Sequence, residues 1–503
     1  MPTRDAPWHR LLLVVLLVLL GTGCARVFGS RGIAPSGLAT QEERLRQLLA
    51  HGNAGTALSS FGGAAVWPQD EVLRALYHGL VAYHAGDYAA SARLFDAAGE
   101  LADDRVTKSL SRSAFALISN DLALPYEPAP TERLMIPYYA ALARLPLGDI
   151  TGAAVETRRL SLLLQQFDGD DRVDAPLRAT LRYFAATVFA IAGEHNDADV
   201  AYRNAVALGL TLPPPAARAP RDSGAAVIVL EHGFVAHRVE QGLIVMVLPE
   251  EIDAITGGAA DERVATAARV AARVLNRAVD VAQHAPRRRP AMLFVPAPEQ
   301  TPRKRKRKKT VCSEHVVPAD SAAGTPAKKV KECREVEEEV DELPYLLKVA
   351  WPVYRSDYAA LPAARLVAAQ DTFGFVAGAD LSRAVTADFE RERLLDIART
   401  IARGTAKLAL TKGAEYRVEE KSELAGRIVG LLGNAGNVLL ERADTRSWHL
   451  LPAGISLAYV PLPAGERTLT LELREADSAA HRIDVGPIAV RAGELTIVPV
   501  RAW

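Results

Sequence analysis

The clearest hydrophobic pattern in the chain lies in the segment 76–98, which reads LYHGLVAYHAGDYAASARLFDAA. Gly79 and Ser91 are small positions at which two helices can approach closely, and Phe95 is an aromatic residue that can fill the space toward a further helix. Gly86 is followed by Asp87 and has the character of a turn between the two helices. The pattern predicts a pair of antiparallel helices joined by a glycine turn.

The same spacing of glycine, small residue, aromatic and small residue recurs in the N-terminal part. The further copies are Gly52, Ala57, Phe61 and Ala64, then Gly193, Ala198, Tyr202 and Ala205, with a weaker copy at Gly148-Asp149 and Ala153. Gly52 and Gly86 are 34 residues apart, which is the period of tetratricopeptide (TPR) repeats, and the register resembles theirs. We therefore expect a TPR-like α-helical repeat domain over residues 42–210, followed by a Pro-rich linker at 211–225.

After the linker, short runs rich in Val and Ile predict strands. The first runs, 226–230, 233–239 and 243–248, suggest a meander, and helices are expected at 261–283, 380–412 and 423–442. Further strands are expected at 291–295, 345–354, 364–369 and 372–376. From residue 447 the runs 455–460, 467–474, 482–490 and 494–500 alternate apolar and polar residues and predict a small antiparallel sheet or sandwich. The fold class expected is α+β multidomain, with a mixed α/β domain at 226–446 and a β-rich part at 447–503.

A charged segment at 299–342 interrupts the α/β pattern. It contains RKRKRKK at 303–309 and an acidic block at 332–342, so we expect a solvated surface insertion whose basic and acidic arms attract each other. Cys312 and Cys333 form the expected disulfide of this insertion. A nuclear localisation or nucleic-acid patch, and a metal site that includes His315, are the disfavoured alternatives.

The N-terminus has the pattern of an export signal. Arg4, His9 and Arg10 precede the apolar run 11–20, which is too short to span a membrane. Gly21-Thr22-Gly23-Cys24 then resembles the lipobox of bacterial lipoproteins, which implies a signal peptide at 1–23, acylation of Cys24 and a lipid-proximal tether at 24–41. The residue after the cysteine is alanine and not aspartate, so the resemblance implies the outer membrane, with the protein facing the periplasm.

The composition adds little to this picture. The 503 residues have a formal net charge of zero, so overall charge suggests neither nucleic acid nor an acidic membrane surface as a partner. At about 100–200 residues per domain, the length predicts two or three cores.

Several segments together resemble an uncharacterised family of TPR-containing bacterial outer-membrane lipoproteins. They are 120–126 (NDLALPY), 138–142 (YYAAL), 148–149 with 155–159 (VETRR), 443–448 (ADTRSW) and 451–453 (LPA). The resemblance covers most of the mature chain except 299–342. It implies an architecture and a location but no activity.

Two sets of residues are candidate binding sites. Aromatic and arginine residues are enriched in binding hot spots, and the helical domain offers Tyr126, Tyr138, Tyr139, Arg158 and Arg159 as candidates for protein binding. Arg399, Arg403 and Lys407 follow one another at four-residue spacing on one helix face and are anion-binding candidates. The alternative for this stripe is pairing with Glu390, Glu392 and Asp396. Arg446 and Trp448 lie at a helix-to-sheet junction, where a tryptophan usually fills a core.

Enzyme motifs such as G-x-S-x-G, H-E-x-x-H and G-x-x-x-x-G-K-[ST] are missing from the sequence. We therefore expect no enzyme, no cofactor and no metal. The expected function is a lipid-anchored scaffold that faces the periplasm and recruits envelope proteins through its TPR surface. The alternative is a glycan-binding lipoprotein that holds peptidoglycan or an exported polysaccharide with the terminal sheet and Trp448.

Overall fold

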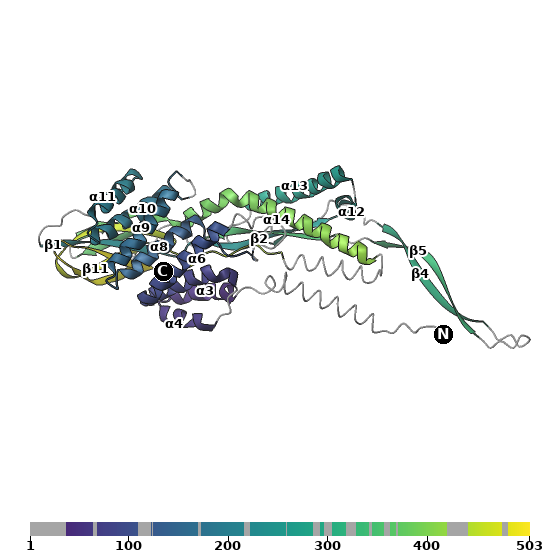
Figure 1. The fold of residues 1–503 in the computed structure, drawn as a ribbon, viewed down its shortest axis with the longest axis horizontal. Helices are drawn as coiled ribbons and strands as arrows, with labels where there is room; N and C mark the ends of the chain where they lie inside the picture. Colours follow the sequence, from purple (N-terminus) through teal and green to yellow (C-terminus); the bar gives the residue numbers. More distant parts are fainter. Residues whose placement is uncertain are drawn as a thin grey trace, which may run out of the picture.

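The fold is mixed α/β, with helices and several small sheets (Figure 1). The computed structural model describes residues 37–63, 68–108, 122, 124–169, 173–215, 222–257, 259–284, 292–295, 304–317, 328–341, 345–356, 363–368, 371–419, 441–474 and 481–503. The signal peptide, Cys24 and the helix expected at 423–442 lie outside these ranges, except for its last two residues, which are not helical.

Antiparallel helix hairpins form the N-terminal part. Their helices are α3 (Gly37–Ala50), α4 (Ala54–Ser59), α5 (Glu71–His84), α6 (Tyr88–Lys108), α8 (Pro130–Arg144), α9 (Ile150–Gln166), α10 (Ala175–Ile191) and α11 (His195–Ala207), with short 3₁₀ turns at Ser60–Gly63 and Pro68–Asp70. The turns after α3, α5, α8 and α10 each contain a glycine with a φ of 71° to 82°, where a side chain would be strained. These glycines are Gly52, Gly86, Gly148 and Gly193, the four that mark the spacing in the sequence.

The small positions of the pattern let helices α5 and α6 approach closely. A Cβ added to Gly79 would lie 3.1 Å from the ring of Phe95, and the hydroxyl of Ser91 donates a hydrogen bond to the Gly79 carbonyl at 2.8 Å. Phe95 is buried and its ring stacks on Tyr139 of α8. The aromatic residue thus links the α5–α6 hairpin to the next helix, as the spacing predicts.

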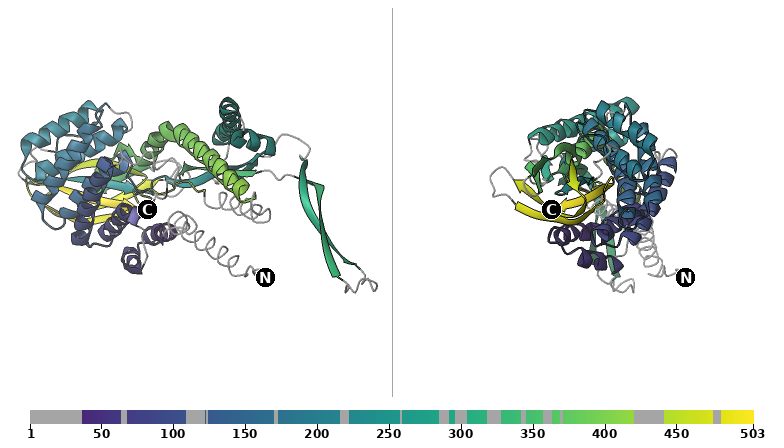
Figure 2. Two further views of the ribbon diagram at one scale, coloured as in Figure 1. Left: turned by 45° about the vertical axis from the view of Figure 1, so that its right-hand side comes forward. Right: turned by 90° about the vertical axis from the view of Figure 1, so that its left-hand side faces the viewer.

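Two four-stranded sheets pack against each other beneath the helices. The first has the order β13-β1-β10-β9 and the second β12-β11-β7-β8. Their strands are β1 (Ser223–His232), β7 (Ala363–Ala368), β8 (Asp371–Gly374), β9 (Val376–Asp380), β10 (Gly454–Pro463), β11 (Gly465–Arg474), β12 (His481–Val490) and β13 (Leu495–Ala502). In Figure 2 the purple-to-blue helices lie on one side of the yellow strands.

Strand β1 is buried on both faces, which explains its nearly continuous apolar sequence. Val227 and Val229 belong to the core shared with the helices, whereas Ala226 and Ile228 belong to the core between the two sheets. The molecule therefore has three layers here: helices, first sheet and second sheet.

A third sheet has the order β3-β2-β6 and is packed by three helices. Its strands are β2 (His237–Val247), β3 (Met292–Val295) and β6 (Tyr345–Arg355), and the helices are α12 (Pro249–Gly257), α13 (Ala260–His284) and α14 (Leu381–Glu419). Leu243, Trp351 and Ile401 lie in its separate hydrophobic core. Helix α13 agrees with the helix predicted at 261–283, but the meander was wrong, because β1 and β2 lie in different sheets.

The charged insertion is a two-stranded antiparallel ribbon of β4 (Lys304–Val317) and β5 (Lys328–Asp341). Cys312 lies opposite Cys333 in the register, and the two form the predicted disulfide. The ribbon extends away from the helices and the paired sheets (Figures 1 and 2).

Two expected boundaries need correction. The division at 446/447 separates no domains, because β1 pairs with β10 and β13, and β7 pairs with β11. The Pro-rich segment is also less of a linker than expected. Tyr183 and Tyr202 donate hydrogen bonds to the carbonyls of Pro213 and Leu212, and β1 begins inside the predicted range 211–225.

Candidate functional site

A buried polar junction brings together residues that are far apart in the sequence. Glu132 lies in the first turn of α8, where its carboxylate accepts hydrogen bonds from the backbone N–H of Ala129 at 2.9 Å and of Trp448 at 2.6 Å. The Tyr126 hydroxyl donates a third bond to it. A carboxylate is favoured at a helix N-terminus, and this one also fixes the segment 443–448 against the helical layer.

Arg446 is the second tie in this junction. Its guanidinium donates to Asp70 at 3.0 Å, to Asp444 at 2.6 Å and to the carbonyl of Leu124 at 3.0 Å. Burial alone would raise the pKa of the Asp444 carboxyl, but the charge and hydrogen bonds of Arg446, together with the charge of Arg238, lower it below its usual value. Leu124 of the motif 120–126 thus meets the segment 443–448 through Arg446, and Arg446 is buried.

Glu42, Tyr77 and His449 extend the junction toward α3 and α5. Tyr77 donates to the Ser447 carbonyl at 3.0 Å and accepts from the His449 N–H at 3.1 Å. Glu42 Oε2 lies 3.3 Å from His449 Nδ1. Burial raises the pKa of Glu42 to about 8 and lowers that of His449 well below 6.5. Both groups are therefore largely uncharged near neutral pH, so this close contact is not an ion pair.

Three predicted protein-binding residues are part of this interior, so that prediction was wrong for them. Tyr126, Tyr138 and Tyr139 are at most 4% exposed. Tyr138 donates to Glu231 of β1 at 2.9 Å, and the ring of Tyr139 packs against the rings of both Phe95 and Trp448. Their aromatic character serves the contact between helices and sheet, because aromatic residues at helical spacing bury large areas.

Trp448 fills the core, as expected of a tryptophan at this junction. It is fully buried, and no described residue accepts a hydrogen bond from its indole N–H. A glycan-binding role for Trp448 would require an exposed ring, so the structure contradicts that role.

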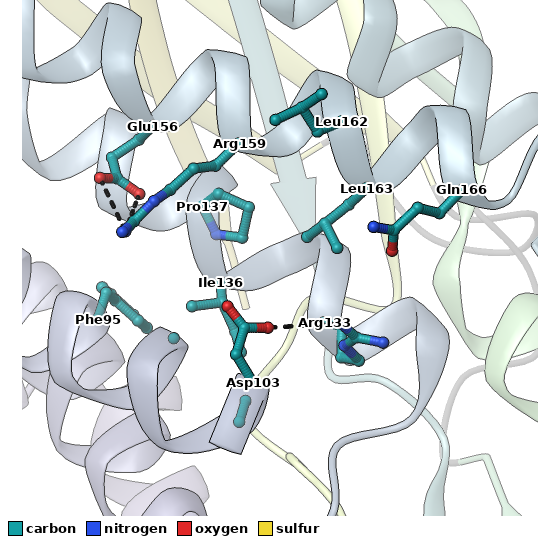
Figure 3. A pocket seen from close by; sticks show the side chains of 12 residues that line it. Phe95, Asp103, Arg133, Ile136, Pro137, Glu156, Arg159, Leu162, Leu163 and Gln166 are labelled. Atoms are coloured by element: carbon teal, nitrogen blue, oxygen red, sulfur yellow. Dashed lines mark hydrogen bonds and ion pairs between the residues drawn. The ribbon is translucent and has the colours of Figure 1, made fainter. Parts of the chain in front are cut away.

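The helical layer also has an open groove between α6, α8 and α9, with a volume of about 450 Å³ (Figure 3). We call it the α6–α8–α9 groove. Its twelve lining residues are Phe95, Gly99, Ala102, Asp103, Arg133, Ile136, Pro137, Glu156, Arg159, Leu162, Leu163 and Gln166. Apolar side chains from all three helices line it, and Leu162 is 59% exposed.

Ion pairs border the apolar part of this groove. Arg133 of α8 lies 3.5 Å from Asp103 of α6, and Arg159 lies 3.4 Å from Glu156 on α9 (Figure 3). The Arg159 side chain is 53% exposed, so it can change partner at little cost. An apolar floor with a charged border is the arrangement that binds amphipathic peptides.

Of the two predicted arginines, Arg158 and Arg159, only one lines the groove. Arg159 lines the groove, whereas Arg158 pairs with Glu194 at 2.5 Å. The sequence analysis missed Leu162 and Leu163. The available signal was the run Leu162-Leu163-Leu164, because helical periodicity cannot bury three consecutive leucines on one face. Leu164 is fully buried and Leu162 is exposed.

The anion-binding prediction for the α14 stripe was wrong. Arg403 is 3% exposed and Lys407 lies 2.5 Å from Glu441, which also lies 3.9 Å from Arg403. Arg399 pairs with Asp396 at 3.1 Å, which agrees with the pairing alternative. The three cations thus neutralise carboxylates of this chain.

In the described part of the chain, no group of three or more His, Cys, Asp or Glu side chains is arranged to hold a metal ion. None of the described helices is long and apolar enough to cross a membrane. Comparison of the chain with family models, curated proteins and solved structures gave no match.

Proposed function

We propose that this protein is a lipid-anchored scaffold that faces the periplasm and binds an envelope protein in the α6–α8–α9 groove through TPR-like hairpins. The groove is the observation that carries the proposal. It combines an exposed leucine with apolar side chains from three helices and two ion pairs at the border. Its size suits the apolar face of one amphipathic helix or a short peptide.

The membrane anchor rests on the sequence. The apolar run 11–20 and Cys24 resemble a lipoprotein signal, and acyl chains on Cys24 would hold the groove near the outer membrane. Cys24→Ser should abolish both globomycin-sensitive processing and membrane attachment. A wild-type chain that is released in soluble form and processed normally would contradict the anchor.

Site-specific photo-crosslinking in cells tests the binding site. A photoreactive amino acid at Leu162 should give a discrete crosslinked product with one envelope protein, because Leu162 lines the groove. The matched control is the same residue at Val206 of α11, which is 43% exposed but lies outside the groove.

The charged substitution Leu162→Glu should then weaken binding of the identified partner, whereas Val206→Glu should leave it unchanged. We expect a loss of about tenfold or more, because a carboxylate must be desolvated in an apolar groove. Equal crosslinking at both positions, or equal affinity of both variants, would contradict the proposal.

A further inference from the structure

The β4–β5 ribbon has two outer edges that no other strand of the described chain covers. The sheet contains only β4 and β5, and each strand is 14 residues long. The outer edge of a strand has a row of N–H and C=O groups that can pair with a further strand. An isolated two-stranded sheet is only marginally stable in water, and three or more strands are usually needed. The ribbon would therefore gain stability from another strand.

The two strands have opposite charge along half of their length. Residues 304–309 of β4 are all Lys or Arg, and residues 335–341 of β5 are Glu or Asp except for two valines. The register places Lys304 opposite Asp341, Lys306 opposite Glu339 and Lys308 opposite Glu337. One edge of the ribbon is therefore basic and the other is acidic over the same stretch.

This arrangement selects a particular partner. Charged edge strands usually prevent association, because two edges of the same sign repel each other. Here a basic edge repels a second basic edge but attracts an acidic one. When β4 of one ribbon lies beside β5 of another, each acidic residue gains a second row of cations, and cross-strand pairs of opposite charge are stabilising.

We propose that copies of this chain associate edge to edge through their ribbons, with β4 of one copy paired to β5 of the next. The contact joins two different surfaces, so it is heterologous. Such contacts build rings when the rotation closes and open arrays when it does not. The disulfide between Cys312 and Cys333 fixes the register of β4 against β5 and thereby aligns the two charged rows in every copy. The proposal does not depend on the groove.

A charge-swapped chain tests this pairing. In this variant all six basic residues at 304–309 become Glu, and Glu335, Glu337, Glu338, Glu339 and Asp341 become Lys. The register still pairs basic with acidic positions, so the hairpin can fold, and formation of the Cys312–Cys333 disulfide reports that it has. In the swapped chain β4 is acidic and β5 is basic, so its own copies still attract each other when β4 lies beside β5. In a mixed pair, acidic β4 of the swapped chain would lie beside acidic β5 of the wild type, or basic β5 beside basic β4, so the two edges repel each other.

Sedimentation of the full chain in density-matched detergent should show oligomers for the wild type and for the swapped chain, each weakened at high salt. In mixtures labelled for energy transfer, each chain should prefer its own kind by roughly tenfold, since several cross-strand charge pairs change sign. A monomeric wild type, a monomeric swapped chain with its disulfide formed, or free mixing of the two chains would each overturn the proposal.

Discussion

At the residue scale, the junction explains the buried charged residues that hold the start of α8 and the segment 443–448 together. Glu132 and Arg446 are both buried and both bind backbone groups of distant segments. A sequence shows that such residues are present but not which partners neutralise them, because the partners are hundreds of positions away. Sequence analysis therefore predicted the buried Trp448 but interpreted the neighbouring tyrosines as a surface.

Arg446→Met should destabilise the protein strongly. The change leaves the buried Asp70 and the partly buried Asp444 without the Arg446 guanidinium, and breaking a buried ion pair in this way costs about 3–5 kcal/mol. Arg158→Met is the matched control, because it breaks an exposed pair with Glu194 and should cost about 1 kcal/mol or less. Urea unfolding of the two variants measures both values. If both variants lose a similar free energy of unfolding, Arg446 contributes no more to stability than the exposed Arg158 does.

Glu42 predicts a specific dependence of stability on pH. Its pKa in the folded protein is about 8 against 4.5 for an unperturbed carboxyl, with burial as the main cause. Between these pH values the folded state retains a proton that the unfolded chain releases. The contribution of Glu42 to the free energy of unfolding therefore falls as pH rises. The glutamine of Glu42→Gln is neutral at every pH. The free energy of unfolding of this variant should therefore rise relative to that of the wild type by up to about 1.4 kcal/mol per pH unit in that range.

The comparison uses the difference between Glu42→Gln and the wild type, because the buried histidines have the opposite pH dependence. His232 has a pKa lowered to about 4 by burial, so its contribution is lost as pH falls below about 6.5. Both proteins contain His232, whose pKa is shifted by burial and Arg501 and not by Glu42, so its effect cancels. The free energy of unfolding of both proteins is measured at several pH values. If the two curves run parallel, the pH dependence does not come from Glu42.

At the scale of elements, periodicity predicted α13, α14 and most strands but neither α12 nor how the strands pair. Helix α13 and strand β6 fall where the pattern placed them, because their apolar positions repeat at 3.6 and 2 residues. Residues 237–239 of the first run and 243–247 of the second lie in the single strand β2, and β2 pairs with β3 and β6 instead of β1. Pairing depends on long-range contacts, which local spacing does not encode.

We expect the disulfide to supply most of the stability of the paired strands β4 and β5. It closes a loop between residues 21 positions apart, and such a bond contributes about 3 kcal/mol by restricting the unfolded chain. The ribbon is rich in trypsin sites, so Cys312→Ser should be cleaved much faster than the wild type within 304–341. Mass spectrometry of the fragments identifies the cleavage sites. Equal cleavage rates would show that strand pairing alone holds the ribbon.

At the scale of the whole molecule, segments from both ends of the chain share one interior. Leu76 and Tyr139 from the helices belong to the same core as Val229 of β1 and Trp448. Strand β1 is held between β10 and β13, which follow it by more than two hundred residues. The sequence indicated a helical domain, an α/β domain and a β-rich part because the spacing of apolar residues changes at those points. Local spacing does not show that strands from the last two parts form common sheets.

This shared core predicts that the helical segment is not an independent domain. A fragment of residues 37–215 would expose the face that Trp448 and Val229 cover, so we expect it to bind a hydrophobic dye and to unfold without a cooperative transition. Coexpression with residues 222–503 should restore the transition, because the second fragment supplies β1 and the segment 443–453. Calorimetry of the fragment, the pair and the full chain makes the comparison. If the fragment alone unfolds as cooperatively as the pair, the helices hold their own core and the junction is only a contact between domains.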